Sequence, residues 1–115
     1  MADSPIRAKS FKFALKIIRL STKLQQRREY VISNQLVRAG TSIGSNVEEA
    51  QAGQSRRDFL SKMAIASKEA RETKYWLRLI DKSQMASVDV HDELDDAEEL
   101  IRILTAIVKT AGRSK

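Results

Sequence analysis

Hydrophobic residues recur along most of the chain at intervals of three and four, the spacing that places them on one side of an α-helix. Four such segments are predicted as helices, at about residues 5–25, 33–52, 56–82 and 88–110. No segment alternates polar and apolar residues with a period of two, so no β-strand is predicted. The sequence therefore predicts an all-α protein, an antiparallel up-down-up-down four-helix bundle that occupies residues 1–115 as a single domain.

Residues that typically start or end helices mark the predicted boundaries. Ser4 and Pro5 are expected to start the first helix, because serine can cap a helix and proline suits its first position. Gly53 is expected to end the second helix as a C-terminal glycine. Ser55, followed by Asp58, resembles a capping box at the start of the third helix.

The first predicted helix is apolar over more of its circumference than one core contact requires. At about 100° per residue, its apolar side chains fill roughly 220°; they are Phe11, Phe13, Ala14, Leu15, Ile17, Ile18, Leu20 and Leu24. A helix on the outside of a monomeric bundle needs an apolar stripe only slightly wider than about 100°. Large exposed apolar patches are rare on monomers, so a second copy of the chain is the expected cover. The alternative is a helix seated deeply in its own bundle.

Charge is unevenly distributed along the chain, whose formal net charge is +6 and whose pI is about 9.8. The first 85 residues carry +9 and the last 30 carry −3. Cations line one side of two predicted helices: Lys9, Lys12, Lys16, Arg19 and Lys23 in the first, and Lys68, Arg71, Lys74, Arg78 and Lys82 in the third. The acids that open the fourth predicted helix are interpreted as complements of its dipole.

Two interpretations of the cationic rows stay open. They favour a polyanion such as RNA or DNA, bound in a salt-dependent and largely sequence-independent way. They are also what the solvated face of any amphipathic helix looks like. Tyr75 is the one aromatic residue beside the cations of the third helix. This scarcity of aromatics favours binding of a nucleic-acid backbone or structured duplex over reading of single strands.

Polar residues also occur on the inward sides of the second and third predicted helices. Glu69 projects into an apolar arc, and a carboxylate aimed at a core must be paired or protonated. Arg38 is the most economical partner, with Ser42 and Asn46 beside it and Glu72 at the edge. A polar layer is therefore predicted, whose loss through Glu69→Leu would cost about 3–5 kcal/mol if Arg38 were left buried and unpaired. A catalytic or metal-binding carboxylate pair is the alternative.

Most kinds of enzymatic site have no support in the sequence. The absence of cysteine excludes disulfides, cysteine-based zinc sites and thiolate nucleophiles. His91 is the only histidine, and the Glu-x-x-His pair of di-iron bundles and the glycine-rich nucleotide motifs are missing. We expect a protein that is not an enzyme and has no cofactor. No apolar stretch approaches about 18 residues and no export signal is recognisable, so a cytoplasmic protein without membrane contact is expected.

Two motifs resemble those of a known family. Residues 35–50, QLVRAGTSIGSNVEEA, resemble the signature Q-L-x-R-A-x-x-S-I-x-x-N-x-x-E of the four-helix-bundle proteins associated with 23S rRNA intervening sequences. Residues 68–80, KEARETKYWLRLI, are similar to the K-E-A-x-E-T-x-Y-W-L motif of the same family. The resemblance is weakest in the fourth predicted helix. Its motif residues map onto the predicted polar layer, which suggests an architectural role: Arg38, Ser42, Asn46, Glu69, Glu72 and Thr73.

This resemblance implies an antiparallel bundle that assembles into a ring-like homopentamer, with a biochemical role that is mostly unassigned. A similar fold serves as the accessory protein of diversity-generating retroelements, a basic pentamer that binds nucleic acid. The sequence thus favours a non-enzymatic homo-oligomeric scaffold that binds structured nucleic acid, RNA in the first place, through the basic faces of the first and third helices. The alternative is a protein-interaction module with an acidic protein partner and no nucleic-acid role.

Overall fold

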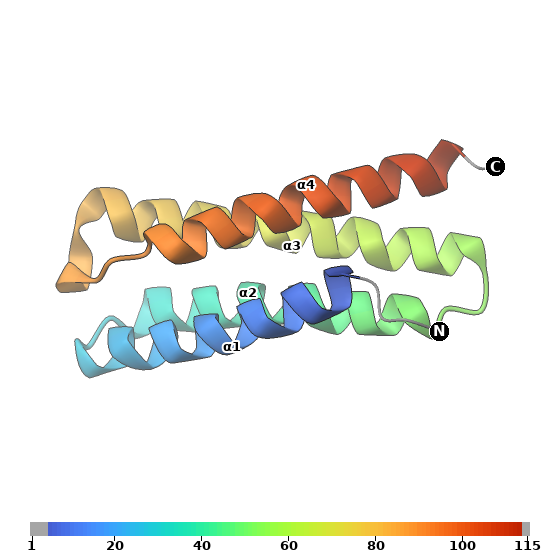
Figure 1. Ribbon diagram of the computed structural model, residues 1–115. Helices are drawn as coiled ribbons and strands as arrows, with labels where there is room; N and C mark the ends of the chain where they lie inside the picture. Colours follow the sequence, from blue (N-terminus) through green and yellow to red (C-terminus); the bar gives the residue numbers. More distant parts are fainter. Residues whose placement is uncertain (1–4, 114–115) are drawn as a thin grey trace.

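The computed structural model describes residues 5–113 and consists of four long helices (Figure 1). They are α1 (Pro5–Gln26), α2 (Tyr30–Gln51), α3 (Arg56–Ser83) and α4 (His91–Arg113), with a short 3₁₀ turn, η1 (Met85–Ser87), before α4. Successive helices run antiparallel and pack side by side, giving an elongated bundle of 47 × 23 × 21 Å. The predicted all-α four-helix bundle is confirmed.

The apolar stripes of all four helices meet in one core, and the α1–α2 contact is the closest part of it. Gly40 of α2 faces Ile17 of α1, where an added β-carbon would lie 2.7 Å from the Ile17 Cγ2 atom. Only glycine allows this approach, because Ile17 is fully buried and its branched side chain cannot move away. Farther along the same contact, the buried Ser33 hydroxyl donates to the Ser21 carbonyl at 3.1 Å.

The turn between α1 and α2 is shorter than predicted. We expected the second helix to start near Ser33, whereas it starts at Tyr30. Arg28 adopts the left-handed conformation with φ of 64°, and this reverses the chain within three residues. The sequence does not indicate so short a turn, because the left-handed conformation favours glycine or asparagine, and neither residue occurs in this turn.

At the α2–α3 connection, the structure confirms the predicted start of α3 but not the predicted conformation at the end of α2. The Ser55 hydroxyl accepts a hydrogen bond from the Asp58 backbone N–H at 3.1 Å, so the predicted cap of α3 is confirmed. Gly53 does follow the end of α2, but no glycine among residues 5–113 has a positive φ. The last carbonyls of α2 are instead satisfied by the N–H groups of Ala52 and Gly53. Ser4, the predicted cap of α1, lies outside the described residues.

The fourth helix begins at His91, three residues later than the predicted Val88. Val88 is extended, with φ of −103° and ψ of 143°, and the buried Val90 anchors the chain before the helix starts. The Asp89 carboxylate accepts the His91 N–H at 3.0 Å and so satisfies one of the first free donors of α4. The helix then continues through Gly112 to Arg113, past the predicted end near residue 110.

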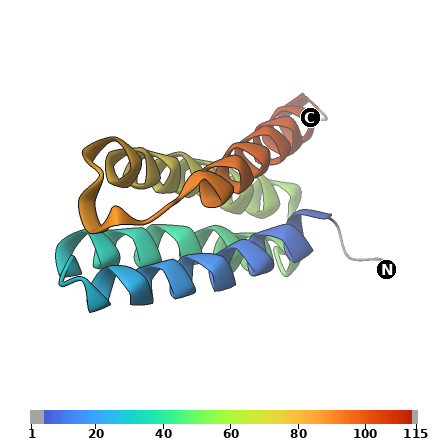
Figure 2. The same cartoon turned by 60° about the vertical axis from the view of Figure 1, so that its left-hand side comes forward.

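The fourth helix is set obliquely to the first (Figure 2). It crosses α1 near its own N-terminal half and diverges from it toward Arg113, so its contact with α1 is the smallest among the neighbouring helices. Within residues 5–113, no helix has an apolar stretch long enough to cross a membrane.

Candidate nucleic-acid interface

Five cations follow one side of the first helix, and the first three of them lie beside α4. We call all five the α1 stripe: Lys9, Lys12, Lys16, Arg19 and Lys23. The Lys16 ammonium lies 2.8 Å from a carboxylate oxygen of Asp92 and 2.5 Å from one of Asp96. The Lys9 ammonium lies 3.1 Å from the Glu99 carboxylate. Two of the five cations are therefore paired with acids of α4.

The environment of Lys16 stabilises its charged form. Hydrogen bonds to Asp92 and then Asp96 raise the pKa of the Lys16 ammonium well above its usual range, against a smaller opposing effect of burial. Lys12 lines the same shallow surface as Lys9, Lys16 and Glu99. Lys12, Arg19 and Lys23 have no ion pair within residues 5–113. The α1 stripe thus keeps three cations that are not neutralised by the described part of its own chain.

The cations of the third helix are less neutralised. We call them the α3 face: Lys68, Arg71, Lys74, Arg78 and Lys82. Lys74 lies 3.6 Å from Glu98 of α4, a long ion pair. Arg71 donates to the Thr105 hydroxyl at 3.1 Å, a neutral partner that orients the guanidinium and leaves its charge uncompensated. The other three cations of this face have no ion pair with any residue that the structure describes.

A depression of about 300 Å³ lies on this face, between α3 and α4. Arg71, Lys74, Tyr75 and Arg78 line it from α3, and Ile101 lines it from α4. The Tyr75 side chain is 55% exposed, and its ring meets the ring of Trp76 edge to face, with centroids 5.4 Å apart. The site therefore combines three cations, an accessible aromatic ring and an aliphatic wall.

Only part of the predicted polar layer forms: Arg38, Glu69 and Glu72 meet at the margin of the α2–α3 interface. Arg38 pairs with Glu72 and lies 3.5 Å from Glu69, and the Trp76 indole N–H donates to Glu72 at 2.9 Å. The Glu69 Oε1 atom is buried and accepts no hydrogen bond from the described residues. The hydroxyl and amide members bond to carbonyls of their own helices instead: Ser42 to Ala39, Asn46 to Ser42 and Thr73 to Glu69.

The loss of stability expected from Glu69→Leu is smaller than predicted from the sequence, because the Arg38 contact is partly exposed. The Arg38 side chain is 50% exposed, and it keeps Glu72 as a partner when Glu69 is removed. The condition for a loss of 3–5 kcal/mol was a buried and unpaired arginine. Since Arg38 is neither, we expect Glu69→Leu to cost less than about 1 kcal/mol, the range of solvent-exposed ion pairs.

An apolar face of α1 is left uncovered on the side away from α4. Phe11, Leu15 and Ile18 are 66%, 39% and 46% exposed, and they recur at four and three residues along one side of the helix. They line a groove of about 320 Å³ that is completed by small residues of α2, among them Gly44 and Ser45. We call this surface the α1 groove. The exposure agrees with the wide apolar arc seen in the sequence.

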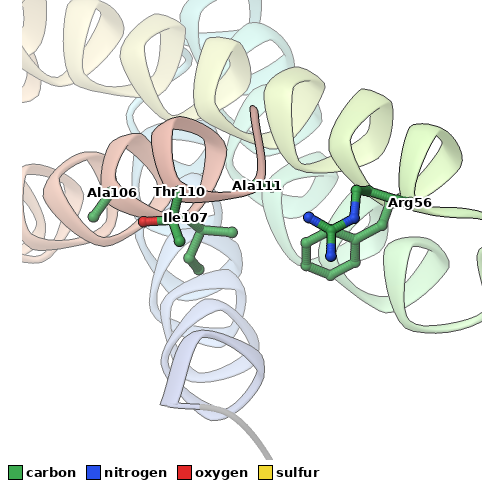
Figure 3. A pocket seen from close by; sticks show the side chains of 6 residues that line it. Arg56, Ala106, Ile107, Thr110 and Ala111 are labelled. Atoms are coloured by element: carbon green, nitrogen blue, oxygen red, sulfur yellow. The ribbon is translucent and has the colours of Figure 1, made fainter. Parts of the chain in front are cut away.

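A second apolar hollow, of about 550 Å³, lies between the start of α3 and the end of α4 (Figure 3). It is bounded by Arg56 and Phe59 at the start of α3 and by Ile107 and Ala111 near the end of α4. The labelled side chains of α4 and Arg56 line its two sides in Figure 3. Sequence reasoning missed it, since it depends on the angle at which α4 diverges.

Comparison with known proteins decides the family. The model of the family described as 23S rRNA-intervening sequence protein matches residues 2–106. The chain belongs to this family. It is similar to a protein of unknown function from the S23 ribosomal protein family of Bacteroides thetaiotaomicron, whose crystal structure was determined at 1.70 Å resolution. The two share 39% identity over 90% of this chain and 98% of that one, with a TM-score of 0.85. No curated protein matches the chain.

In this intervening-sequence protein, the acids of α4 are the residues whose role sequence reasoning missed. Asp92, Asp96 and Glu99 repeat at four and three residues on α4, and the two cations they pair with, Lys9 and Lys16, are seven residues apart on α1. This repeat was readable in the sequence as a helix face complementary to the α1 stripe. The sequence interpretation gives Asp92 and Asp96 only a role as complements of the helix dipole and gives Glu99 no role, because the partner helix becomes visible only in the packed bundle.

Proposed function

We propose that this intervening-sequence protein is a non-enzymatic, self-associating scaffold that binds structured nucleic acid, RNA in the first place, mainly through the α3 face. The observation that carries the proposal is that only one of the five cations of this face, Lys74, forms an ion pair with an acid among the described residues. Unpaired cations on a rigid helix attract phosphates, and the bound counterions released from the nucleic acid provide most of the binding free energy.

The α1 stripe has a smaller part in the proposed function. Lys9 and Lys16 are already paired with α4, and a phosphate would have to compete with the carboxylates that hold them. Lys12, Arg19 and Lys23 remain available and can extend the cationic surface. The sequence predicts nucleic-acid binding through both helices. We therefore propose a main binding site on α3 and a weaker one on α1.

Self-association is proposed because the α1 groove exposes large apolar side chains. Phe11, Leu15 and Ile18 form a continuous patch, and such patches on single chains commonly mark sites of contact with another chain. A ring of five copies is the assembly that the family resemblance implies. Cyclic assembly would repeat the α3 face around the ring, so one nucleic acid could contact several copies and bind more tightly than to a single copy.

Titration of labelled RNA hairpins, followed by fluorescence anisotropy at about 50 and 200 mM salt, tests the binding. We expect affinity to fall steeply with salt, because each phosphate contact contributes close to one to the logarithmic slope. Absence of binding at 50 mM salt would contradict the proposal. Equal binding of polyglutamate and RNA would instead favour the alternative, an acidic protein partner.

Light scattering of two variants tests the assembly. Phe11→Asp places a charge in the α1 groove and is expected to give monomers. Val31→Asp is the matched control, since Val31 is 79% exposed and does not line the groove. A wild-type protein that stays monomeric at high micromolar concentration, or two variants that behave alike, would refute the role of the groove.

A further inference from the structure

We infer that the depression on the α3 face binds one unpaired nucleotide, with its base stacked on Tyr75 and its flanking phosphates beside Arg71 and Arg78. The inference rests on the proposed nucleic-acid binding and names the part of the nucleic acid that the site selects. It differs from the expectation drawn from the sequence, which favoured a backbone or duplex and not an exposed base.

The charges around the depression favour an anion. Three cations line it, and within the described residues the only acid paired with any of them is Glu98, at 3.6 Å from Lys74. Arg71 is oriented by its hydrogen bond to Thr105, so it can bind a phosphate without first losing the freedom of a long side chain. Arginine presents paired donors that match phosphate oxygens, and Arg71 and Arg78 are two turns apart on the same helix.

The wall of the depression favours a flat, unsaturated ring. Tyr75 is more than half exposed, so its ring is accessible from solvent. Trp76 supports it edge to face and is itself held by a hydrogen bond from its indole to Glu72. Glu72 in turn pairs with Arg38 of α2, which fixes this row of side chains to the bundle. Tyr75 is thus an aromatic platform on a rigid support, and Ile101 adds apolar contact on the α4 side.

A ligand that has both an anionic group and an accessible planar ring fits this site, and an unpaired nucleotide has both. In a duplex the faces of the bases are covered by their neighbours, whereas bases in loops, bulges and ends can be splayed out and stacked on aromatic side chains. Base–aromatic stacking tolerates any base, so the site would select unpaired nucleotides without reading their sequence. A structured RNA offers such nucleotides at its loops, which reconciles this site with the proposed function.

Two RNA hairpins of equal length and charge and with the same loop test the inference: one has a continuous stem, and the other has one base pair fewer and two separate bulged adenines in its stem. We expect the full-length protein to bind the bulged hairpin about tenfold more tightly at about 100 mM salt. Tyr75→Ser should remove this preference, whereas Tyr75→Phe, which keeps the ring, should retain it. Tyr30→Ser is the matched control, because Tyr30 is exposed to the same extent, 56%, and lies on α2 away from the depression.

Equal binding of the two hairpins by the wild type would overturn the inference and leave the proposed function standing. The same conclusion follows if Tyr75→Ser and Tyr30→Ser lower the preference equally. Failure of both hairpins to bind at about 50 mM salt would instead refute the proposed function itself. Circular dichroism of each variant checks folding, and the exposed position of Tyr75 makes retained helicity the expected result.

Discussion

The α1 stripe and the α3 face each contain five cations at helical spacing, yet the bundle places them in different environments. The α1 stripe lies against the acidic first half of α4, and Lys16 alone contacts two carboxylates. On the α3 face, Arg71 contacts the neutral Thr105, Ile101 lines the depression, and Lys74 alone pairs with an acid of α4. A cationic row on one helix therefore becomes a binding surface or an internal contact according to the charge of its neighbour.

The side of α4 that each row of cations meets explains the difference. Lys9 near the start of α1 meets Glu99, and Lys16 farther along meets Asp92 and Asp96 nearer the start of α4. Asp81 near the end of α3 lies 3.6 Å from His91 at the start of α4, so the second half of α3 lies beside the same acidic stretch of α4 as α1 does. Asp92, Asp96 and Glu99 are paired with α1, whereas on the α3 face only Lys74 pairs with an acid of α4, Glu98. Each exposed pair is worth only about 0.2–1 kcal/mol, but several in a row fix the rotation of α4 about its axis.

The largest expected effect comes from reversing charge on the α3 face. Arg71→Glu combined with Arg78→Glu should weaken RNA binding about one hundredfold at 100 mM salt and lower the salt slope by about two, because two phosphate contacts are lost. The melting temperature should change little, since Arg78 has no ion pair within residues 5–113 and Arg71 only a neutral partner. Anisotropy titration and thermal melting measure the two quantities.

The matched control for this experiment lies on the α1 stripe. Arg19→Glu combined with Lys23→Glu makes the same change in net charge on two exposed cations. We expect a loss of less than about tenfold. Equal losses for the two pairs would show that binding follows net charge alone, and the distinction between the two rows would be wrong.

The second largest expected effect is a loss of stability when the charge at position 16 is reversed. Lys16→Glu removes two ion pairs and places a third carboxylate beside Asp92 and Asp96. The free energy of unfolding should fall by about 1–2 kcal/mol, and the melting temperature by several degrees. Lys12→Glu serves as the control, because Lys12 is exposed and has no ion pair with the described residues. Similar melting of both variants would mean that the α4 acids do not stabilise the contact.

A smaller effect is expected from removing the acids and leaving the cations. Asp92→Asn combined with Asp96→Asn frees the Lys16 ammonium for phosphate, so RNA affinity should rise a few-fold and the salt slope should increase by at most about one. Glu29→Gln combined with Asp58→Asn makes the same charge change on two acids that have no ion pair within residues 5–113, and it is the reference. If the reference variant gains as much affinity, the gain reflects net charge and not the release of the α1 stripe.

The smallest expected effect concerns pH. The pKa of His91 is raised by its hydrogen bond to Asp89 and by the nearby Asp81 carboxylate. A folded-state pKa above the unfolded value means that the stabilisation is fully present below about pH 6.5 and is lost as pH rises through the folded-state value. Stability should therefore decline slightly between pH 6 and pH 8, and His91→Gln should remove the decline. Lys16 also has a raised pKa, so its contribution stays constant over this range. A slope that persists in His91→Gln would assign the titration to another group.

The sequence determined the helices of this intervening-sequence protein and their apolar faces, because both depend on residues close together in the chain. The spacing of Leu36, Ile43 and Val47 predicts a buried face of α2, and these residues are fully buried. Ser55 and Asp58 likewise define the start of α3 through a local hydrogen bond. The surplus apolar arc of α1 also was readable from periodicity, and Phe11 and Ile18 are indeed exposed.

Only the tertiary structure decided which cations remain unpaired and available to bind an anion. Lys16 and Asp96 are 80 residues apart, and their contact depends on the rotation and crossing angle of α4, which no local pattern specifies. The start of α2 at Tyr30 was decided by the left-handed Arg28, a conformation that the rest of the bundle imposes on an ordinary residue. The depression beside Tyr75 exists for the same reason, since its walls come from two helices. Short-range periodicity sets the faces of a helix, whereas the long-range packing of the helices sets what each face contacts.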